Sequence, residues 1–499
     1  MSQSAAAAVS YDPVDSRQKI AFIGSECYPF IKTGGLGDVM YALPRALIRE
    51  GCEVRVILPL YRCMADKYKQ MLTWKGSFMM DLTQDGRTFF VGIMETEMDG
   101  VIYDFIDNRE FFDWGNPYTG LWEDIPKYCY FSKAALAVLN YLEWIPAVIH
   151  CHDWQAALVP MYLRTRFDST PVGSAKSVLT IHNLRFQGIC SIDHLKYWSG
   201  LPDYLFHYPW LKINEDEANM FKGGLAFADR ITTVSATYAR EIQTASYGEG
   251  LDSHLRYHSP KLVGIVNGID TDIWNPASDA LLAEPYSADN FLEKKILNKR
   301  ALQQKTGLLE DDGKMVLGLV SRLTDQKGLD LIDAIFPKLM DGNTQFVVLG
   351  TGDSRYENAF RYYAGKYKGF VSANIAYNES VAHSIYAGAD AFLVPSLFEP
   401  CGLTQLIAMR YGSVPIVRET GGLKDTVQPY DAPANTGNGF TFTDYRADGL
   451  LDAVNAAKTL FFTDRWHWDE MVGRDMRKDV SWDQSAVQYM DLYASLSEE

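Results

Sequence analysis

The sequence predicts an α/β protein with two doubly wound, Rossmann-like domains that face each other across a cleft. Short apolar, β-rich runs alternate with helix-length segments along the chain. Runs such as Val-Ile-Leu-Pro-Leu at 56–60 and Phe-Leu-Val-Pro at 392–395 are continuous rather than alternating. Continuous runs are typical of parallel strands buried on both faces. The runs also outnumber the strands that one such sheet usually holds, so we expect two sheets.

Eleven runs are predicted as strands. The first sheet takes Lys19–Glu26, Glu53–Tyr61, Ala147–Asp153, Ser177–Asn183, Arg230–Ala236 and Leu262–Asn267. The second takes Met315–Leu323, Gln345–Gly350, Phe370–Tyr377, Ala391–Ser396 and Val414–Glu419. Strand-like runs between 78 and 106 come without helices, which predicts a hairpin extension of the first sheet.

The turn-rich stretch Asn267–Pro276 marks the domain boundary, because a helical pattern near 290–306 and a fresh strand–helix series follow it. We therefore expect domains at 18–275 and 276–480. Residues 1–17 are Ala/Ser-rich and predict a disordered tail. A final helical pattern runs over Trp482–Ser497, within a terminal segment of residues 481–499.

Composition narrows the class of protein. The chain has 499 residues and a net charge of −16, which argues against nucleic acid as a partner. No run approaches the roughly 18 apolar residues of a membrane helix. Seven cysteines, with no C-x-x-C pair, indicate reduced thiols in a reducing compartment. The N-terminus lacks an apolar signal region, so we expect no secretory or transit signal.

The first candidate site is a glycine loop after the first strand, Lys32-Thr-Gly-Gly-Leu-Gly-Asp38, with a helical stretch at about 36–50 behind it. Backbone N–H groups at a helix N-terminus bind phosphate, and a lysine adds a point charge. The loop matches neither the Walker A pattern nor G-x-G-x-x-G. A tight turn explains the glycines equally well.

Two further candidates lie in the second half. Arg322 and Lys327 flank a loop that ends a strand, where they either grip a phosphate or are solvated surface cations. Glu399, in Phe392-Leu-Val-Pro-Ser-Leu-Phe-Glu-Pro-Cys-Gly402-Leu-Thr404, ends another strand. Pro400 fits a first helical turn, so Glu399 either binds a sugar beside a diphosphate or caps the helix. Glu419-Thr-Gly-Gly-Leu-Lys-Asp repeats the glycine loop on the next strand.

Together these motifs resemble the bacterial glycogen synthase and plant starch synthase family of retaining GT-B glycosyltransferases. The resemblance runs from about Lys19 to the C-terminus. It also includes Cys151-His-Asp-Trp-Gln, Thr180-Ile-His-Asn, Thr233-Val-Ser and Ile265-Val-Asn-Gly-Ile-Asp. In this family the last helix crosses back to the first domain, so we expect the same of residues 481–499.

The resemblance implies roles for individual residues. Lys32 and the Gly34-Gly35 loop meet the diphosphate and glucose of ADP-glucose, and Arg322 and Lys327 neutralise the leaving diphosphate. Glu399 binds glucose hydroxyls and stabilises the positive charge at the anomeric carbon.

The remaining roles also follow from the resemblance. Amides in the Gly402–Thr404 segment, those of Leu403 and Thr404, hold the distal phosphate, and His182 touches the transferred glucose. Asp38 and Asn267 are candidates for the same pocket, and Tyr377 packs on adenine.

The chain also departs from the pattern of many retaining GT-B enzymes. They place a second Glu eight residues after the first, where this chain has Ile407. Without a carboxylate pair we expect a same-face substitution in which the leaving diphosphate takes the acceptor's proton. The aromatic segment Phe111–Trp122 either lines an acceptor site or packs as a surface loop. His150 and His152 lack further ligands at metal spacing, so we predict site-shaping residues and no metal or cofactor.

We therefore predict an α-1,4-glucan synthase that uses ADP-glucose and a glycogen or starch-like primer. UDP-glucose as donor, or a catalytically silent glucan-binding homologue, are the alternatives. We expect a bacterial cytoplasmic enzyme, although a trimmed enzyme of the plastid stroma would have the same sequence features.

Overall fold

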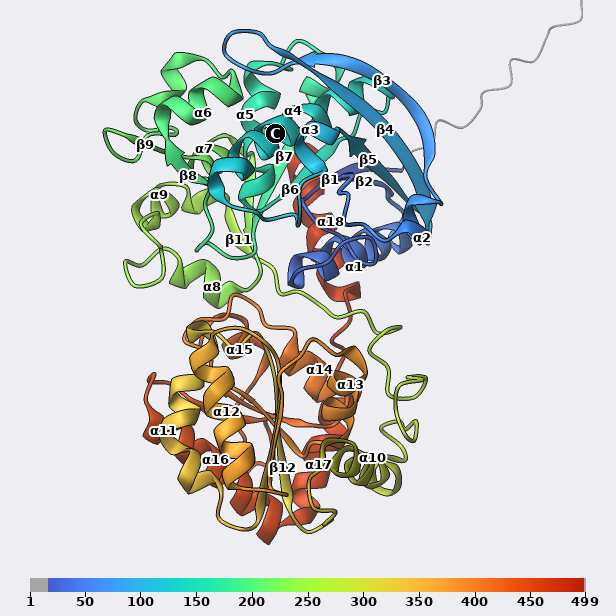
Figure 1. Ribbon diagram of the computed structural model, residues 1–499, viewed down its shortest axis with the longest axis vertical. Coiled ribbons are helices and arrows are strands. Elements are labelled where there is room, and N and C mark those ends of the chain that lie inside the picture. Colours follow the sequence, from blue (N-terminus) through green and yellow to red (C-terminus); the bar gives the residue numbers. More distant parts are fainter. Residues whose placement is uncertain (1–16, 498–499) are drawn as a thin grey trace, which may run out of the picture.

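A computed structural model of the chain describes residues 17–497. The predicted tail therefore lies outside the described residues, except for Arg17. The fold is α/β with two sheets, each in its own domain, and the two domains lie one above the other in Figure 1. This confirms the predicted fold class. No helix among residues 17–497 is long and apolar enough to span a membrane.

The first sheet has the strand order β11-β10-β7-β6-β1-β2-β5-β4-β3. Neighbouring strands are parallel except at β3–β4 and β4–β5, so β4 forms the predicted hairpin extension. The strands are β1 (Lys19–Ile23), β2 (Glu53–Pro59), β3 (Thr73–Asp81), β4 (Thr88–Met98), β5 (Val101–Asp107), β6 (Val148–His152), β7 (Lys176–Ile181), β10 (Arg230–Thr233) and β11 (Leu262–Gly264).

The second sheet is parallel throughout, in the order β14-β13-β12-β15-β16-β17. Its strands are β12 (Met315–Val320), β13 (Thr344–Leu349), β14 (Val371–Asn374), β15 (Ala391–Val394), β16 (Val414–Arg418) and β17 (Phe440–Phe442). All eleven predicted runs are strands. The short strand β17 and the small hairpin of β8 (Ile189–Ser191) and β9 (Glu217–Asn219) were not predicted from the sequence.

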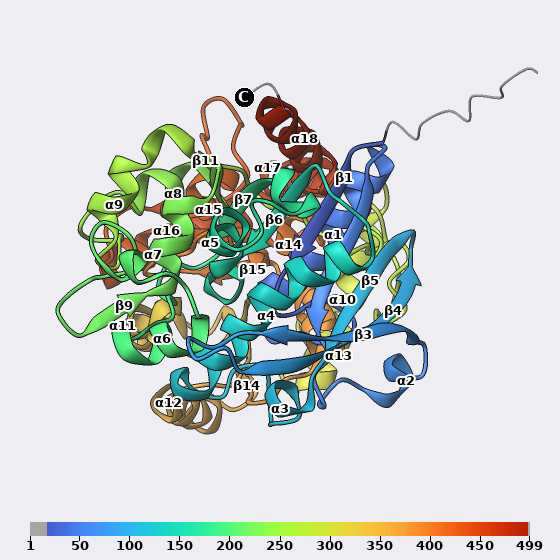
Figure 2. The same ribbon diagram turned by 90° about the horizontal axis from the view of Figure 1, so that it is seen from above.

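Helices flank each sheet, as Figures 1 and 2 show. In the first domain they are α1 (Gly35–Arg49), α2 (Asp66–Lys69), α3 (Arg109–Phe112), α4 (Leu121–Tyr141), α5 (Leu158–Thr165), α6 (Ile192–Ser199), α7 (Met220–Phe227), α8 (Ala236–Glu241) and α9 (Asp252–Tyr257). After them come α10 (Phe291–Thr306), α11 (Leu329–Leu339), α12 (Ser354–Lys366), α13 (Glu379–Gly388), α14 (Thr404–Arg410), α15 (Gly421–Thr426), α16 (Ala447–Thr463), α17 (Arg465–Arg477) and α18 (Asp483–Ser497).

The last helix, α18, returns to the first domain and lies against α1 (Figure 1). Tyr493 of α18 hydrogen-bonds His150 of β6, and Arg49 of α1 pairs with Asp483 at 2.6 Å. Two chain crossings therefore connect the domains, one near residues 267–276 and one near residue 481. The exact boundaries between the domains stay a prediction.

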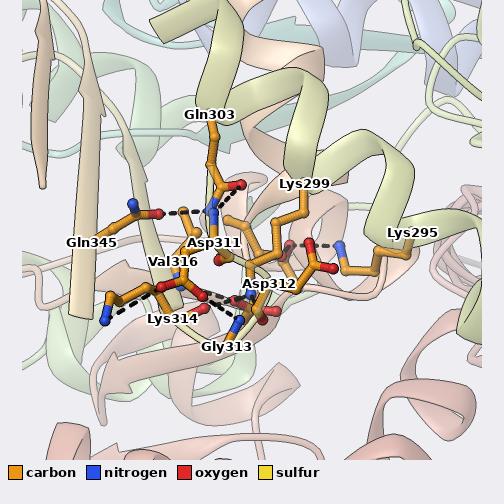
Figure 3. Close-up of polar contacts among 12 residues, drawn as sticks. Lys295, Lys299, Gln303, Asp311, Asp312, Gly313, Lys314, Val316 and Gln345 are labelled. Carbon is orange, nitrogen blue, oxygen red and sulfur yellow. Dashed lines mark hydrogen bonds and ion pairs between the residues drawn. The ribbon is translucent and has the colours of Figure 1, made fainter. Parts of the chain in front are cut away.

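Helix α10 is fixed to the second sheet by buried polar side chains (Figure 3). Lys299 Nζ pairs with Asp390 Oδ2 at 2.8 Å, and the same carboxylate accepts the Val316 N–H. Gln303 donates to Gln345 Oε1 at 2.8 Å. Because buried charges need partners, these contacts place α10 firmly beside β12 and β13.

Candidate active site

The candidate residues cluster where parallel strands of the two sheets end. Lys32 follows β1 and His182 follows β7, while Arg322 and Lys327 follow β12 and Glu399 follows β15. Ligands bind outside the carboxyl ends of strands in such sheets. The two sets of strand ends face each other, because a Cβ placed on Gly35 would lie 3.9 Å from Leu403 Cδ1.

Glu399 and Lys327 form an ion pair that the sequence did not predict. Lys327 Nζ donates to Glu399 Oε2 at 2.6 Å, and the Ser396 hydroxyl donates to the same oxygen at 2.9 Å. The Glu399 side chain is 10% exposed and that of Lys327 17%. Glu399 Oε1 accepts no hydrogen bond from residues 17–497, so one carboxylate oxygen stays available to a ligand.

Lys327 lies in the predicted loop, on the 3-10 turn Asp325–Lys327, and α11 begins at Leu329 after its N-cap Gly328. One local feature differs from the sequence expectation. Helix α14 begins at Thr404, so Pro400 is not in its first turn. The reason is Gly402, whose φ of +76° is left-handed and interrupts a helix between Pro400 and Thr404. The bend turns Leu403 toward Gly35 of the first domain.

Arg322 is exposed, two residues after the end of β12. Its carbonyl accepts the Thr324 N–H, but its guanidinium has no hydrogen bond or ion pair with any described residue. A guanidinium is a bidentate donor for carboxylates and phosphates. Arg322 is therefore free to bind an anionic ligand at the end of β12.

The glycine loop of the first domain is held by a buried carboxylate. The N–H and hydroxyl of Thr33 donate to Glu26 Oε2 at 2.6 and 2.5 Å. Burial raises the pKa of Glu26, and the hydrogen bonds from Thr33 oppose this. Lys32 Nζ pairs with Asp38 at 2.7 Å in a position that is about one-third exposed. The loop is thus preformed, with Gly34 just before α1 and Gly35 as its first residue.

His182 belongs to a row of stacked imidazoles. Its Nε2 lies 2.9 Å from His152 Nδ1, and the His152 and His150 rings stack 4.2 Å apart. Burial lowers the pKa of His182 to about 3, so its ring is neutral near pH 7. His150 is bonded to Thr180 and Tyr493. The described residues contain no group of three or more His, Cys, Asp or Glu side chains that could hold a metal.

Asp153 shapes the loop that carries His182. Its Oδ1 accepts the His182 N–H at 2.8 Å and lies 3.4 Å from the Asn183 nitrogen. Its backbone φ is +57°, unusual for a residue with a side chain. Burial raises the pKa of Asp153 to about 7. A strained backbone and a buried carboxyl at a strand end are typical of functional sites.

The remaining candidates have different surroundings. Tyr377, on the β14–α13 loop, is 88% exposed. Asn267 is buried, and its Oδ1 has no hydrogen-bond partner among the described residues. A buried acceptor without a partner is unusual and leaves Asn267 able to bind a ligand.

Comparisons with known proteins give a consistent result. Residues 19–257 match the family model of the starch synthase catalytic domain, and residues 300–460 match glycosyl transferases group 1. The chain is 50% identical to a glycogen synthase of Lachnospira eligens over 480 residues, which are 96% of this chain and 100% of that protein. A glycogen synthase of Bacillus cereus strain Q1 is 44% identical over the same shares. The chain belongs to the glycogen and starch synthase family.

Two solved structures are similar to this chain, and one of them is a starch synthase. The catalytic domain of Arabidopsis thaliana starch synthase IV, bound to ADP and acarbose, matches with a TM-score of 0.90 and 37% identity. The match covers 97% of this chain and all of that one. Sucrose-phosphate synthase of Thermosynechococcus elongatus matches at 17% identity with a TM-score of 0.60, over 97% of this chain and all of that one. The second likeness shows the fold alone.

Sequence reasoning missed a cavity beside the candidate residues of this synthase-family chain. Its volume is about 410 Å³, and it lies between the domains next to Glu399. Both domains line it, with Arg185, Tyr238, Ser246, Tyr247, Glu249, Leu397 and Phe398. Except for Leu397 and Phe398, none of these residues stands in a phosphate-type or carboxylate motif. The apolar pair that precedes Glu399 was the one available signal.

The aromatic segment Phe111–Trp122 is partly packed structure, and its role as an acceptor-lining loop stays a prediction. Phe111 and Phe112 are buried, so part of the segment is packed structure. The Tyr118 hydroxyl, however, lies 2.8 Å from Ser25 Oγ, next to Glu26 and the glycine loop. Burial raises the pKa of Tyr118 well above its usual value. Tyr118 thus brings the segment to the edge of the site.

Proposed function

We propose that the protein transfers glucose from ADP-glucose to the non-reducing end of an α-1,4-glucan, with retention of the anomeric configuration. The observation that carries this is the Glu399–Lys327 pair, with Arg322 unengaged in the same β12–α11 loop as Lys327 and the Lys32 loop across from it. ADP and acarbose in the structure of starch synthase IV support the choice of a nucleotide donor and a glucan acceptor.

The donor diphosphate is proposed to lie between the two loops. Arg322 and Lys327 bind it from the second domain, and Lys32 binds it from the first, with its charge held in place by Asp38. An ammonium group has three protons, and Lys327 uses one for Glu399. The other two remain for phosphate oxygens, so Lys327 links the sugar-binding carboxylate to the leaving group.

Other donor contacts follow from position. The amides of Leu403 and Thr404, after the bend at Gly402, hold the distal phosphate, and Gly34 and Gly35 allow close approach from the first domain. The exposed Tyr377 ring covers adenine. Aromatic rings commonly stack on nucleobases, and 88% exposure leaves this ring free to do so.

Chemistry at the anomeric carbon is a same-face substitution. The bond from C1 to the diphosphate oxygen breaks with its electrons on the phosphate. The acceptor O4 bonds to C1 on the same face, and its proton passes to a leaving phosphate oxygen. Glu399 Oε1 stabilises the developing positive charge. Ile407, where a second carboxylate would stand, is buried in α14. His182, neutral near pH 7, and Asn267 position the glucose.

The acceptor end of the glucan is proposed to occupy the interdomain cavity beside Glu399. A volume of about 410 Å³ is within the range for small-ligand sites. Tyr238 and Tyr247 offer aromatic faces to sugar rings, and Arg185 and Glu249 offer groups for hydroxyls. Seven free cysteines favour a reducing compartment, for which we propose the bacterial cytoplasm, and a net charge of −16 makes nucleic acid an unsuitable partner.

ADP release with glycogen as acceptor tests this function. We expect ADP-glucose to exceed UDP-glucose in kcat/KM by at least about tenfold, or roughly 1.4 kcal/mol. Equal rates with both donors would show a synthase that does not select between ADP-glucose and UDP-glucose. Glycogen binding without release of ADP or UDP would show a catalytically silent glucan-binding homologue. A Tyr247→Ala variant should raise KM for glycogen more than KM for ADP-glucose.

A further inference from the structure

Two short helices, one from each domain, meet beside the active site. Helix α8 belongs to the first domain and α15 to the second, and Figure 1 shows them facing each other where the domains meet. Apart from Tyr238 of α8, which lines the proposed acceptor cavity, neither helix contains a residue that the proposed donor or acceptor contacts require. The role of α8 and α15 therefore depends on the contacts that they form between the two domains.

Each helix gives a carboxylate to the first turn of the other. Glu241, the last residue of α8, accepts the Gly421 N–H at 3.1 Å and the Thr420 hydroxyl at 3.0 Å, where α15 begins. Asp425 of α15 accepts the Thr237 N–H at 2.8 Å and the Thr237 hydroxyl at 2.5 Å, where α8 begins. We call these five residues the α8–α15 joint.

The joint depends on helix geometry and not on ion pairs. Among the described residues, neither Glu241 nor Asp425 forms an ion pair with a lysine or arginine. Carboxylates at helix N-termini are stabilised by exposed N–H groups and by the helix dipole, and these contacts are directional. A shift of one helix against the other therefore strains both halves of the joint at once, so a relative motion of the domains that keeps the joint intact turns about it.

The same helices touch the backbone at Glu399. The Gly422 N–H donates to the Glu399 carbonyl at 3.1 Å, and a Cβ on Gly421 would lie 1.9 Å from that oxygen. From the other side, the Ser235 hydroxyl caps α8 and donates to the Pro400 carbonyl at 2.6 Å. Hydrogen bonds from the N-terminal ends of both helices therefore hold the backbone at Glu399 and Pro400.

We propose that the α8–α15 joint is the pivot of the two domains and that Glu241 and Asp425 are positioning residues that set Glu399 against the first domain. The proposal rests on the proposed function, because Glu399 is taken as the residue that acts on the glucosyl group. When Glu241 and Asp425 both form their hydrogen bonds, the carbonyl oxygens of Glu399 and Pro400 keep fixed directions. When one carboxylate loses its hydrogen bonds, the Glu399 side chain is chemically unchanged but displaced.

Glu241→Gln and Asp425→Asn test this proposal, since each keeps the side-chain shape but replaces one acceptor oxygen by an amide donor. We expect kcat to fall at least about tenfold in each, because small misplacements of a reacting group are costly. The ADP Kd should stay within about threefold of wild type, since the nucleotide contacts lie elsewhere. Asp464→Asn, the cap of α17 far from the joint, should leave kcat unchanged.

A double-variant cycle asks whether the two carboxylates act as one unit. Because either single change releases the same pivot, Glu241→Gln with Asp425→Asn should cost little more in kcat than the worse single variant. Fully additive losses in kcat would contradict a single joint. A lowered Tm with wild-type kcat in both single variants would show that the joint is merely structural and overturn the proposal.

If the carboxylate variants do not fold, two smaller substitutions at Thr420 test the joint. Thr420→Ser keeps the hydroxyl that Glu241 accepts, whereas Thr420→Val removes it with little change in volume. We expect wild-type kcat for the serine variant and a several-fold lower kcat for the valine variant, with equal ADP affinity. Equal kcat in both variants would count against the joint.

The proposed function can fail separately from the proposal about the joint. If the wild-type enzyme released no ADP with glycogen, the proposed function would be wrong. Small-angle scattering would then test the joint without any activity measurement. A pivot predicts that Glu241→Gln broadens or shifts the particle's dimensions relative to wild type, and identical profiles would reject it.

Discussion

Glu399→Gln is the substitution whose outcome the structure fixes most closely. The amide keeps the size of the side chain but removes the negative charge that faces the anomeric carbon. Loss of one preorganised electrostatic group typically lowers kcat by about 10²–10³, or about 2.7–4 kcal/mol. Since Glu399 is 10% exposed, water does not replace the lost charge. We expect kcat to fall at least about a hundredfold.

The same substitution should leave ADP binding intact or strengthen it. Lys327 Nζ is held by Glu399 Oε2 at 2.6 Å, so neutralising the carboxylate frees the ammonium for phosphate. We expect the ADP Kd to stay equal or to decrease by up to about tenfold, or 1.4 kcal/mol. Initial rates and calorimetric ADP titrations measure the two effects separately.

Ser396→Ala is the matched control, because it removes the second hydrogen bond to the same oxygen and keeps the charge. Its kcat should fall only a few-fold, by about 1 kcal/mol. If Glu399→Gln kept more than about half of the wild-type kcat, Glu399 would be a structural carboxylate and the proposed roles would be wrong.

Three further predictions concern the phosphate clamp, the Asp153 carboxyl and domain closure. Lys327→Met should weaken ADP binding and lower kcat together, as titrations and rates will show, because the phosphate gains charge as its bond breaks; an unchanged ADP Kd would remove Lys327 from the clamp. Asp153 has a folded pKa of about 7, above its ordinary value of 3.8, so its contribution to stability falls as pH rises through this window, by up to about 1.4 kcal/mol per unit. The unfolding free energy of Asp153→Asn relative to wild type should therefore rise between about pH 4 and about pH 7 and then level off; a pH-independent difference would exclude a raised pKa. Saturating ADP should give a more compact particle in small-angle scattering, because Lys32 and Arg322 lie on different domains, and an unchanged profile would argue against nucleotide-driven closure.

Much of the fold was predictable, because continuous apolar runs report parallel strands directly. All eleven predicted runs are strands, and Glu53–Pro59 ends within two residues of its prediction. β17 escaped because three residues, Phe440–Phe442, carry too little pattern. The start of α14 was misplaced because the left-handed φ of Gly402 is a property of the folded backbone.

The site was predicted as a set of residues but not as a set of contacts. Glu399 and Lys327 are 72 residues apart, and no local pattern reveals that their side chains meet. Glu26 and Asp153 were part of quoted motifs, yet their roles follow from hydrogen bonds to Thr33 and His182. Such contacts depend on how strand ends come together, which the sequence indicates only as an edge of a sheet.

The stereochemistry of the first new linkage tests the central claim most directly. A lone carboxylate at Glu399, paired with Lys327 at 2.6 Å, predicts a substitution on one face of the sugar. Wild-type enzyme is mixed with ADP-glucose and a short α-1,4-glucan, and proton NMR follows the anomeric signals before further elongation. The account predicts α-1,4 signals from the first turnover. A β-linked first product would contradict the mechanism and the roles given to Glu399 and Lys327.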